Sequence, residues 1–114
     1  MLPQVARLRK TRDFKEVFGK RGGTRSGRLF LKARAVKGKS TRFGIVVSKQ
    51  VAAKATDRNR IKRLLREAVR SCMPDVKEGY DIVLVTLPGL VTASLKEAKT
   101  QITGIIKKSS LFKS

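Results

Sequence analysis

The chain has 114 residues, which suits one domain and is too short for two. Its 28 lysines and arginines outnumber 8 acids, for a net charge of +20, and 40% of the residues are hydrophobic. This balance excludes a disordered chain and favours a folded protein that binds a polyanion. Nucleic acid is the first candidate partner, and an anionic membrane surface is the alternative.

The composition also limits the chemistry that the chain can perform. It has no histidine, which removes the commonest general base and metal ligand, and its acids are scattered as single residues. We therefore expect no catalytic residue and no metal ligand on this chain. The single cysteine, Cys72, excludes an internal disulfide and fits a reducing compartment such as the cytoplasm. Its place on a predicted apolar face favours packing over chemistry.

The first predicted element is a short helix over residues 11–20 (TRDFKEVFGK). Phe14, Val17 and Phe18 recur there at spacings of three and four, so they share one helix face. The glycines of RGGTRSG (21–27) then predict a flexible basic loop.

Three segments have strand patterns. Residues 28–36 and 42–49 alternate apolar and polar side chains, and the short link KGKST predicts that they pair as an antiparallel hairpin. Residues 80–86 (YDIVLVT) contain four consecutive apolar side chains, as expected for a strand covered on both faces. The helix predicted between the second and third strands suggests a crossover into a parallel pairing.

Two longer helices complete the predicted elements. They cover residues 56–73, which end before Pro74, and residues 94–108. The elements together predict a single α+β domain over residues 1–114, a two-layer sandwich of a twisted sheet with helices packed on it. Residues 1–10 and 109–114 are mostly polar and basic, so we expect them to be flexible.

The helix over residues 56–73 gathers its cations on the side opposite its apolar stripe. The segment RNRIKRLLRE (58–67) stacks like charges at spacings of four, and each such pair destabilises a helix. Only Arg63 and Glu67 form a favourable pair at that spacing. A solvated charged face is the other interpretation, but such faces normally mix signs. Because guanidinium groups suit bidentate phosphate contacts, the pattern favours binding of nucleic acid.

At RNRIKRLLRE the sequence resembles the protein subunit of bacterial ribonuclease P, whose signature is R-N-R followed by I-K-R and then R-E or R-Q on a helix. Other segments occur in the same order as in that family: DFKEVF, GIVVSKQ, YDIVLVT and a basic C-terminal helix. The resemblance extends from about Leu8 to the last residues.

This resemblance implies both a fold and a function. The family fold is an α/β sandwich with a left-handed βαβ crossover, against the usual right-handed rule. The family's activity is removal of the 5′ leader from precursor tRNA by a catalytic RNA that holds Mg²⁺. The protein binds that RNA through its RNR helix and the leader in a cleft, so the implied partners are the catalytic RNA and precursor tRNA, with no membrane and no small-molecule substrate.

The match to the family motifs also implies site residues. The residues implied to bind the catalytic RNA are Arg58, Asn59, Arg60, Lys62, Arg63, Arg66 and Arg70. Those implied to bind the leader are Phe14, Phe18, Ser48, Lys49 and Phe112. The two helix aromatics would stack on leader bases, which contributes about 1–3 kcal/mol per base, and core packing is the other interpretation for both.

The sequence departs from some family members at two leader positions. Gln50 stands where some members have a second lysine, and Ala33 stands where some have a tyrosine. Alternation along the strand places Phe30 and Lys32 on the face opposite Ala33. Two other functions stay open from the residues alone: a small basic ribosomal or rRNA-binding structural protein, and a protein-only nuclease, which the absence of histidines and acid clusters disfavours.

Overall fold

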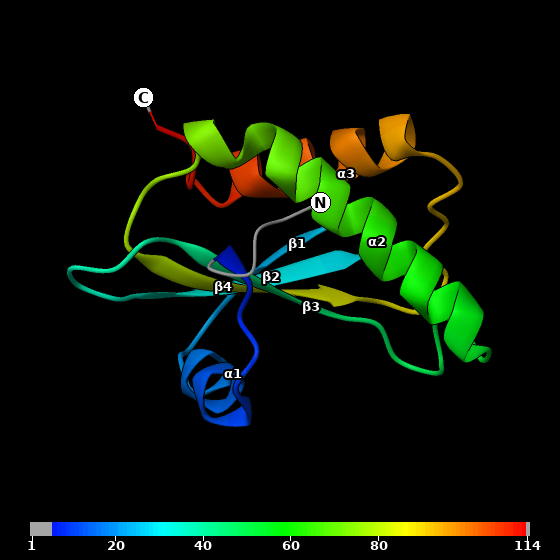
Figure 1. Cartoon of the computed structure of the whole chain (residues 1–114), viewed down its shortest axis with the longest axis horizontal. Helices are drawn as coiled ribbons and strands as arrows, with labels where there is room; N and C mark the ends of the chain where they lie inside the picture. The colour runs from blue at the N-terminus through cyan, green and yellow to red at the C-terminus, as the bar shows by residue number, and fades with distance from the viewer. Residues whose placement is uncertain (1–5, 114) are drawn as a thin grey trace.

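The structure, a computed structural model, describes residues 6–113. They form three α-helices and one sheet of four strands (Figure 1). In chain order the elements are α1 (Thr11–Phe18), β1 (Thr24–Ser26), β2 (Leu29–Ala35), β3 (Arg42–Val46), α2 (Ala55–Cys72), the short 3-10 helix η2 (Met73–Asp75), β4 (Tyr80–Thr86) and α3 (Leu95–Lys108). The predicted α+β class is confirmed, and the three predicted helices lie within two residues of their expected bounds. None of the helices among the described residues is long and apolar enough to cross a membrane.

The strand order β1-β2-β4-β3 corrects one prediction. The expected hairpin between β2 and β3 is wrong, because β4 lies between them, antiparallel to β2 and parallel to β3. The four apolar residues of β4 explain this order, since such a strand is stabilised by neighbours on both edges and cover on both faces. The segment predicted as a loop also contains β1, whose three residues are too few to show alternation.

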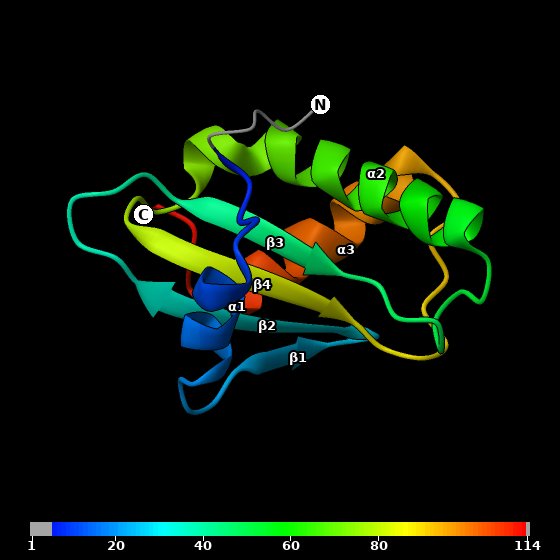
Figure 2. The same ribbon diagram turned by 60° about the horizontal axis from the view of Figure 1, so that its bottom comes forward.

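The crossover from β3 through α2 to β4 is left-handed, as the family resemblance implied. In Figure 2, β3 and β4 run in the same direction with α1 in front of the sheet and α2 behind it. The chain leaves β3, which is the edge strand, passes behind the sheet through α2 and returns in β4, the next strand inward. Most crossovers between parallel strands are right-handed, so this feature marks a particular fold.

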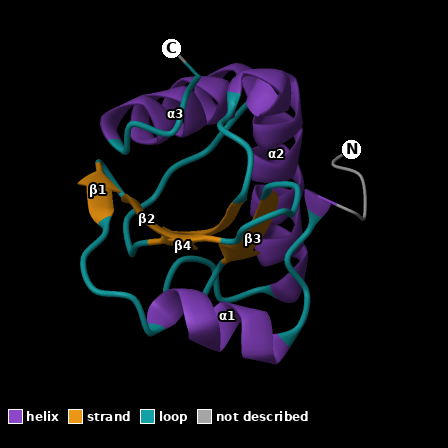
Figure 3. Cartoon of the chain, turned by 90° about the vertical axis from the view of Figure 1, so that its left-hand side faces the viewer, coloured by secondary structure: helices purple, strands orange, loops and turns teal. Residues whose placement is uncertain are grey.

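Helices cover both faces of the sheet. Figure 3 shows α2 and α3 on one face and α1 on the other. The larger apolar core lies between the sheet and α2 and α3, and it includes fully buried Leu65, Ile82 and Ile102. A smaller cluster under α1 contains Val17 and Val83. Because β4 is buried on both faces, the two clusters share it as their common wall.

The terminal segments are tied to this framework where the structure describes them. The Leu8 N–H donates to the Phe43 carbonyl, 2.8 Å away, at the open edge of β3. At the other end Leu111 is buried, and Phe112 forms a bridge with Val76. Flexibility was expected for residues 1–10 and 109–114, of which 1–5 and 114 lie outside the described residues.

An ion network attaches α1 to the sheet. Asp81 of β4 is fully buried, and Arg42 of β3 donates to both of its oxygens, at 3.0 and 2.8 Å. The hydrogen bond to Asp81 raises the pKa of Arg42 above its ordinary value. From α1, Asp13 lies 3.5 Å from Arg42, and Glu16 lies 3.7 Å from Arg34 of β2. Buried charges of this kind persist only when paired, so the network fixes α1 over this end of the sheet.

Next to the ion network, α1 rests on a glycine. The Phe14 ring lies directly over Gly44 of β3, and a Cβ built at Gly44 would fall 2.5 Å from two ring carbons. No side chain fits between the helix and the strand at this point. The close approach of α1 to the sheet therefore requires glycine at position 44.

We predict that Gly44→Ala destabilises the fold by about 1–3 kcal/mol, because the new methyl group must displace the Phe14 ring. Gly104→Ala in α3 is the matched control, since the nearest atom to its Cβ would be Ser26 Oγ at 4.0 Å. Alanine in that helix interior should raise stability by about 0.5–1 kcal/mol. Urea unfolding of both variants measures the two changes. If Gly44→Ala were as stable as the unchanged protein, α1 would tolerate a wider spacing from the sheet.

Candidate nucleic-acid interface

The outer face of α2 carries the predicted RNA-binding residues. Ile61, Leu65 and Val69 are buried on its inner side, and the helix has no side-chain hydrogen bond at its N-cap, Lys54. The predicted residues fall into two groups: Asn59, Arg60, Arg63 and Arg70 are exposed, whereas Arg58, Lys62 and Arg66 are half-buried. The apolar side of α2 therefore packs on the sheet, and half of its cations are exposed while the other half are partly buried.

A shallow hollow of about 200 Å³ lies on this face, lined by Asn59, Arg63, Arg66 and Glu67. Burial lowers the pKa of Arg66 from its ordinary value, and the nearby charge of Arg7 lowers it further. The protein thus holds the Arg66 guanidinium partly desolvated and near a second cation. An anionic partner next to Arg66 would offset the cost of its burial.

The acid in this segment pairs differently from the prediction. Glu67 lies 3.3 Å from Arg70 Nε, three residues away, and not against Arg63 as the spacing of four suggested. Both side chains of this pair are partly exposed, so the pair contributes little to stability. Arg63 stays exposed, with no ion pair among the described residues.

Arg58 has a structural contact that the sequence did not reveal. Its Nη1 donates to the carbonyls of Ala52 and Ala53, at 3.0 and 2.7 Å. These carbonyls belong to the loop between β3 and α2, in which the Ser48 carbonyl accepts from the N–H groups of Val51 and Ala52. Arg58 therefore braces this loop, while its Nε and Nη2 make no hydrogen bond within residues 6–113.

The predicted leader-binding residues are divided between the faces of the sheet. Phe14 and Phe18 lie on the α1 face, where Phe14 is half-buried over Gly44 and Phe18 is 43% exposed. Packing is thus the main role of Phe14, whereas Phe18 presents much of its ring to solvent. Phe112 packs against the other core, so the structure does not bring it together with these two aromatics.

A row of half-buried side chains continues the α1 face beyond the helix. Val46, Val85 and Phe30 are paired neighbours on β3, β4 and β2, and their side chains follow the row in which Gly44 lies under Phe14. Two residues beyond Val46, the loop places half-buried Ser48 and exposed Lys49. This row forms an apolar floor between α1 and the β3–α2 loop.

Phe30 and Lys32 belong to this face, although no role was predicted for them. Lys32 Nζ donates to the Phe18 carbonyl at 3.0 Å, at the end of α1. Strand alternation had separated both residues from Ala33, which packs against the core on the opposite face. The signal for their role was present in the sequence, but it required knowing which face α1 covers.

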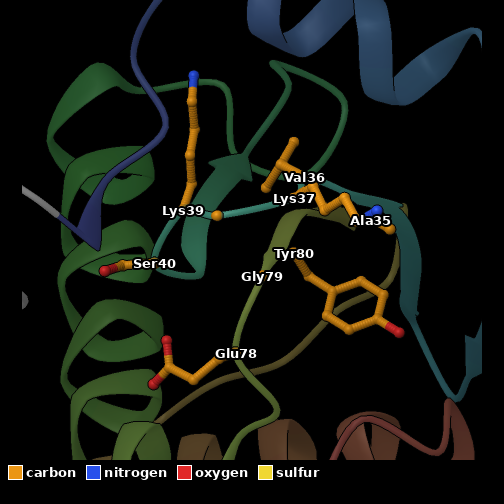
Figure 4. A pocket seen from close by; sticks show the side chains of 9 residues that line it. Ala35, Val36, Lys37, Lys39, Ser40, Glu78, Gly79 and Tyr80 are labelled. Atoms are coloured by element: carbon orange, nitrogen blue, oxygen red, sulfur yellow. The ribbon is translucent and has the colours of Figure 1, made fainter.

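A larger hollow than the one on α2 is not the site. It measures about 800 Å³ and lies at the end of the sheet beside the β2–β3 turn. Figure 4 shows Lys39 and Tyr80 pointing away from each other, so its polar side chains do not converge on a ligand.

Chemistry by side chains has little support in the described part of the chain. No group of three carboxylates or thiols gathers there to hold a metal ion. Cys72 packs against the main core, as predicted, and burial raises the pKa of its thiol, which weakens it as a nucleophile.

Comparison with known proteins agrees with the motifs. A family model described as Ribonuclease P matches residues 2–110. The ribonuclease P protein component of Syntrophomonas wolfei is 40% identical over 115 residues, covering 98% of this chain and 93% of that protein. The one from Alkaliphilus oremlandii is 38% identical over 110 residues, covering 96% of each.

Solved structures agree with the fold. The RNase P protein from Thermotoga maritima has a TM-score of 0.79 at 27% identity, covering 90% of this chain and 96% of that one. The one from Staphylococcus aureus has a TM-score of 0.83 at 22% identity, covering 95% and 98%, which supports the fold alone. From the family match and the relatives of nearly full length, the chain belongs to the family of bacterial ribonuclease P protein components.

Proposed function

We propose that this protein subunit of ribonuclease P binds the catalytic RNA through the outer face of α2. The observation that carries the proposal is the one-sided set of accessible cations on α2, opposed among the described residues mainly by Glu67. Arg60 and Arg63 would contact phosphates, and the hollow of Asn59, Arg63 and Arg66 would receive one of them. We expect the complex in the cytoplasm, where Cys72 stays reduced.

We assign catalysis to the RNA. The described residues offer no carboxylate cluster for Mg²⁺, so the ion would be held by RNA phosphates and not by this chain. The protein's part is electrostatic: its cations reduce the repulsion between catalytic RNA and substrate, which raises the affinity of both for each other and for the ion. Removal of the 5′ leader from precursor tRNA then proceeds at a lower Mg²⁺ concentration.

The α1 face would receive the leader. Phe18 offers an exposed ring for stacking, and the floor of Val46, Val85 and Phe30 continues from it. Lys49 would meet a leader phosphate beyond the end of β3. Phe112, on the opposite face, would contact the leader only where the strand passes around the sheet edge.

Reconstitution tests the whole proposal. Adding the protein to bacterial ribonuclease P RNA at low Mg²⁺ should restore cleavage at the 5′ end of mature tRNA within a precursor, as read from labelled product. The protein alone should leave the precursor intact. Cleavage by the protein without RNA would favour a protein nuclease, and preferential binding to ribosomal RNA would favour a ribosomal role.

A double variant tests the α2 face. Arg63→Ala with Arg66→Ala should weaken binding to the catalytic RNA and reduce the slope of log affinity against log salt by about 0.7–0.9 for each lost phosphate contact. Arg63→Lys with Arg66→Lys is the control, because it keeps the charge and should keep most of the slope. A slope unchanged in the alanine variant would show that these arginines are only solvated.

The aromatics of α1 should separate by role. Phe18→Ala should weaken binding of precursor tRNA to the holoenzyme by about 5-fold to 150-fold, with mature tRNA unaffected, because about 1–3 kcal/mol of stacking on a leader base is lost. Phe14→Ala should instead lower the thermal midpoint, since its ring packs on Gly44. Equal losses on both RNAs for Phe18→Ala would exclude leader stacking.

A further inference from the structure

The outer side of α3 carries a second row of cations. Lys96, Lys99 and Lys107 are exposed and recur with helical spacing on the side opposite the buried residues Ala98 and Ile105. The row extends roughly 16 Å along the helix axis, from the first turn to the last. It lies on a different element from the predicted RNA-binding residues.

No acid among residues 6–113 forms an ion pair with this row. Lys96, Lys99 and Lys107 form no ion pair and no side-chain hydrogen bond within the described residues. Glu97 is the only acid of α3, and its carboxylate accepts from the Ala93 N–H at the helix start, 3.3 Å away. The opposite charge for the lysine row must therefore come from outside the protein or from mobile ions.

A cation at the end of the row joins it to the sheet edge. Lys108 Nζ donates to the Arg25 carbonyl of β1 at 2.7 Å. Arg25 and Arg28 are exposed beside it. The contact joins the last turn of α3 to β1, so the row continues toward the two arginines, and together they are here called the α3 surface.

The chemistry of the α3 surface selects its partner. Lysine is a compact charge on a flexible stem that meets phosphates without reading bases, and the row includes no aromatic ring for stacking. A lipid interface is disfavoured, because the apolar side of α3 is buried against the sheet and cannot insert. The surface therefore fits the backbone of a double-helical nucleic acid.

The position of α3 indicates which RNA this is. Helices α2 and α3 lie side by side in one layer, whereas α1 lies across the sheet (Figure 3). An RNA large enough to contact α2 reaches α3 on the same side of the molecule, away from the face proposed for the leader. We propose that the α3 surface binds the phosphate backbone of a second double-helical segment of the catalytic RNA, distinct from the segment on α2, an inference that rests on the proposed function.

A charge-matched pair of triple variants tests this proposal. The first carries Lys96→Gln, Lys99→Gln and Lys107→Gln, and the second carries Lys37→Gln, Lys39→Gln and Lys77→Gln in loops at one end of the sheet. Thermal unfolding first establishes that both are folded. Binding to ribonuclease P RNA is then measured against salt, with hydroxyl-radical footprinting of the RNA.

The α3 triple should reduce the salt slope by about 0.7–0.9 for each lysine and expose one helical segment of the RNA, while the control triple leaves both unchanged. The double variant of Arg63 and Arg66 should expose a different segment. The proposal is overturned if both triples act alike, if the two footprints coincide, or if only precursor tRNA binding falls. If the unmodified protein protected no part of the RNA, that result would instead contradict the proposed function.

Discussion

The pairing of Arg42 with buried Asp81 is the interaction on which the rest of the structure depends. A carboxylate without exposure is tolerated only when it is paired, and Arg42 donates to both of its oxygens. This pairing joins β3 to β4 and gives Asp13 of α1 a cation to meet. The contact between Asp13 and Arg42 places α1 on the sheet, and this placement determines the position of Phe18.

The same network shapes the charge of the surface. Of 8 acids, Asp13, Glu16 and Asp81 are engaged with Arg34 and Arg42 under α1. Two cations neutralise three acids in that place, so the surplus of positive charge lies elsewhere, mainly on α2, α3 and the loops. The helical layer carries three acids, two in α2 and one in α3, against ten cations in the same two helices, so it remains strongly positive and suited to RNA.

The sequence was sufficient for local features and insufficient for pairings between distant segments. Periodicity alone located α2 and its basic face, because the inner and outer sides of a helix follow from spacing. It could not reveal that β4 separates β2 from β3, since a six-residue link permits either arrangement. The contacts of Arg58 with Ala52 and Ala53, and the position of Phe112 away from Phe14, likewise depend on loop paths and strand order that no spacing encodes.

The central place of β4 has a consequence for how the protein is made. Synthesis yields β2, β3 and all of α2 before Tyr80, so a nascent chain at that stage has no strand to join the inner edges of β2 and β3. The sheet closes only when residues as distant as Leu29 and Thr86 meet, a non-local step that folds slowly. The basic helix is thus synthesised before β4 and α3, and its packing in the core is complete only when these later elements have joined it.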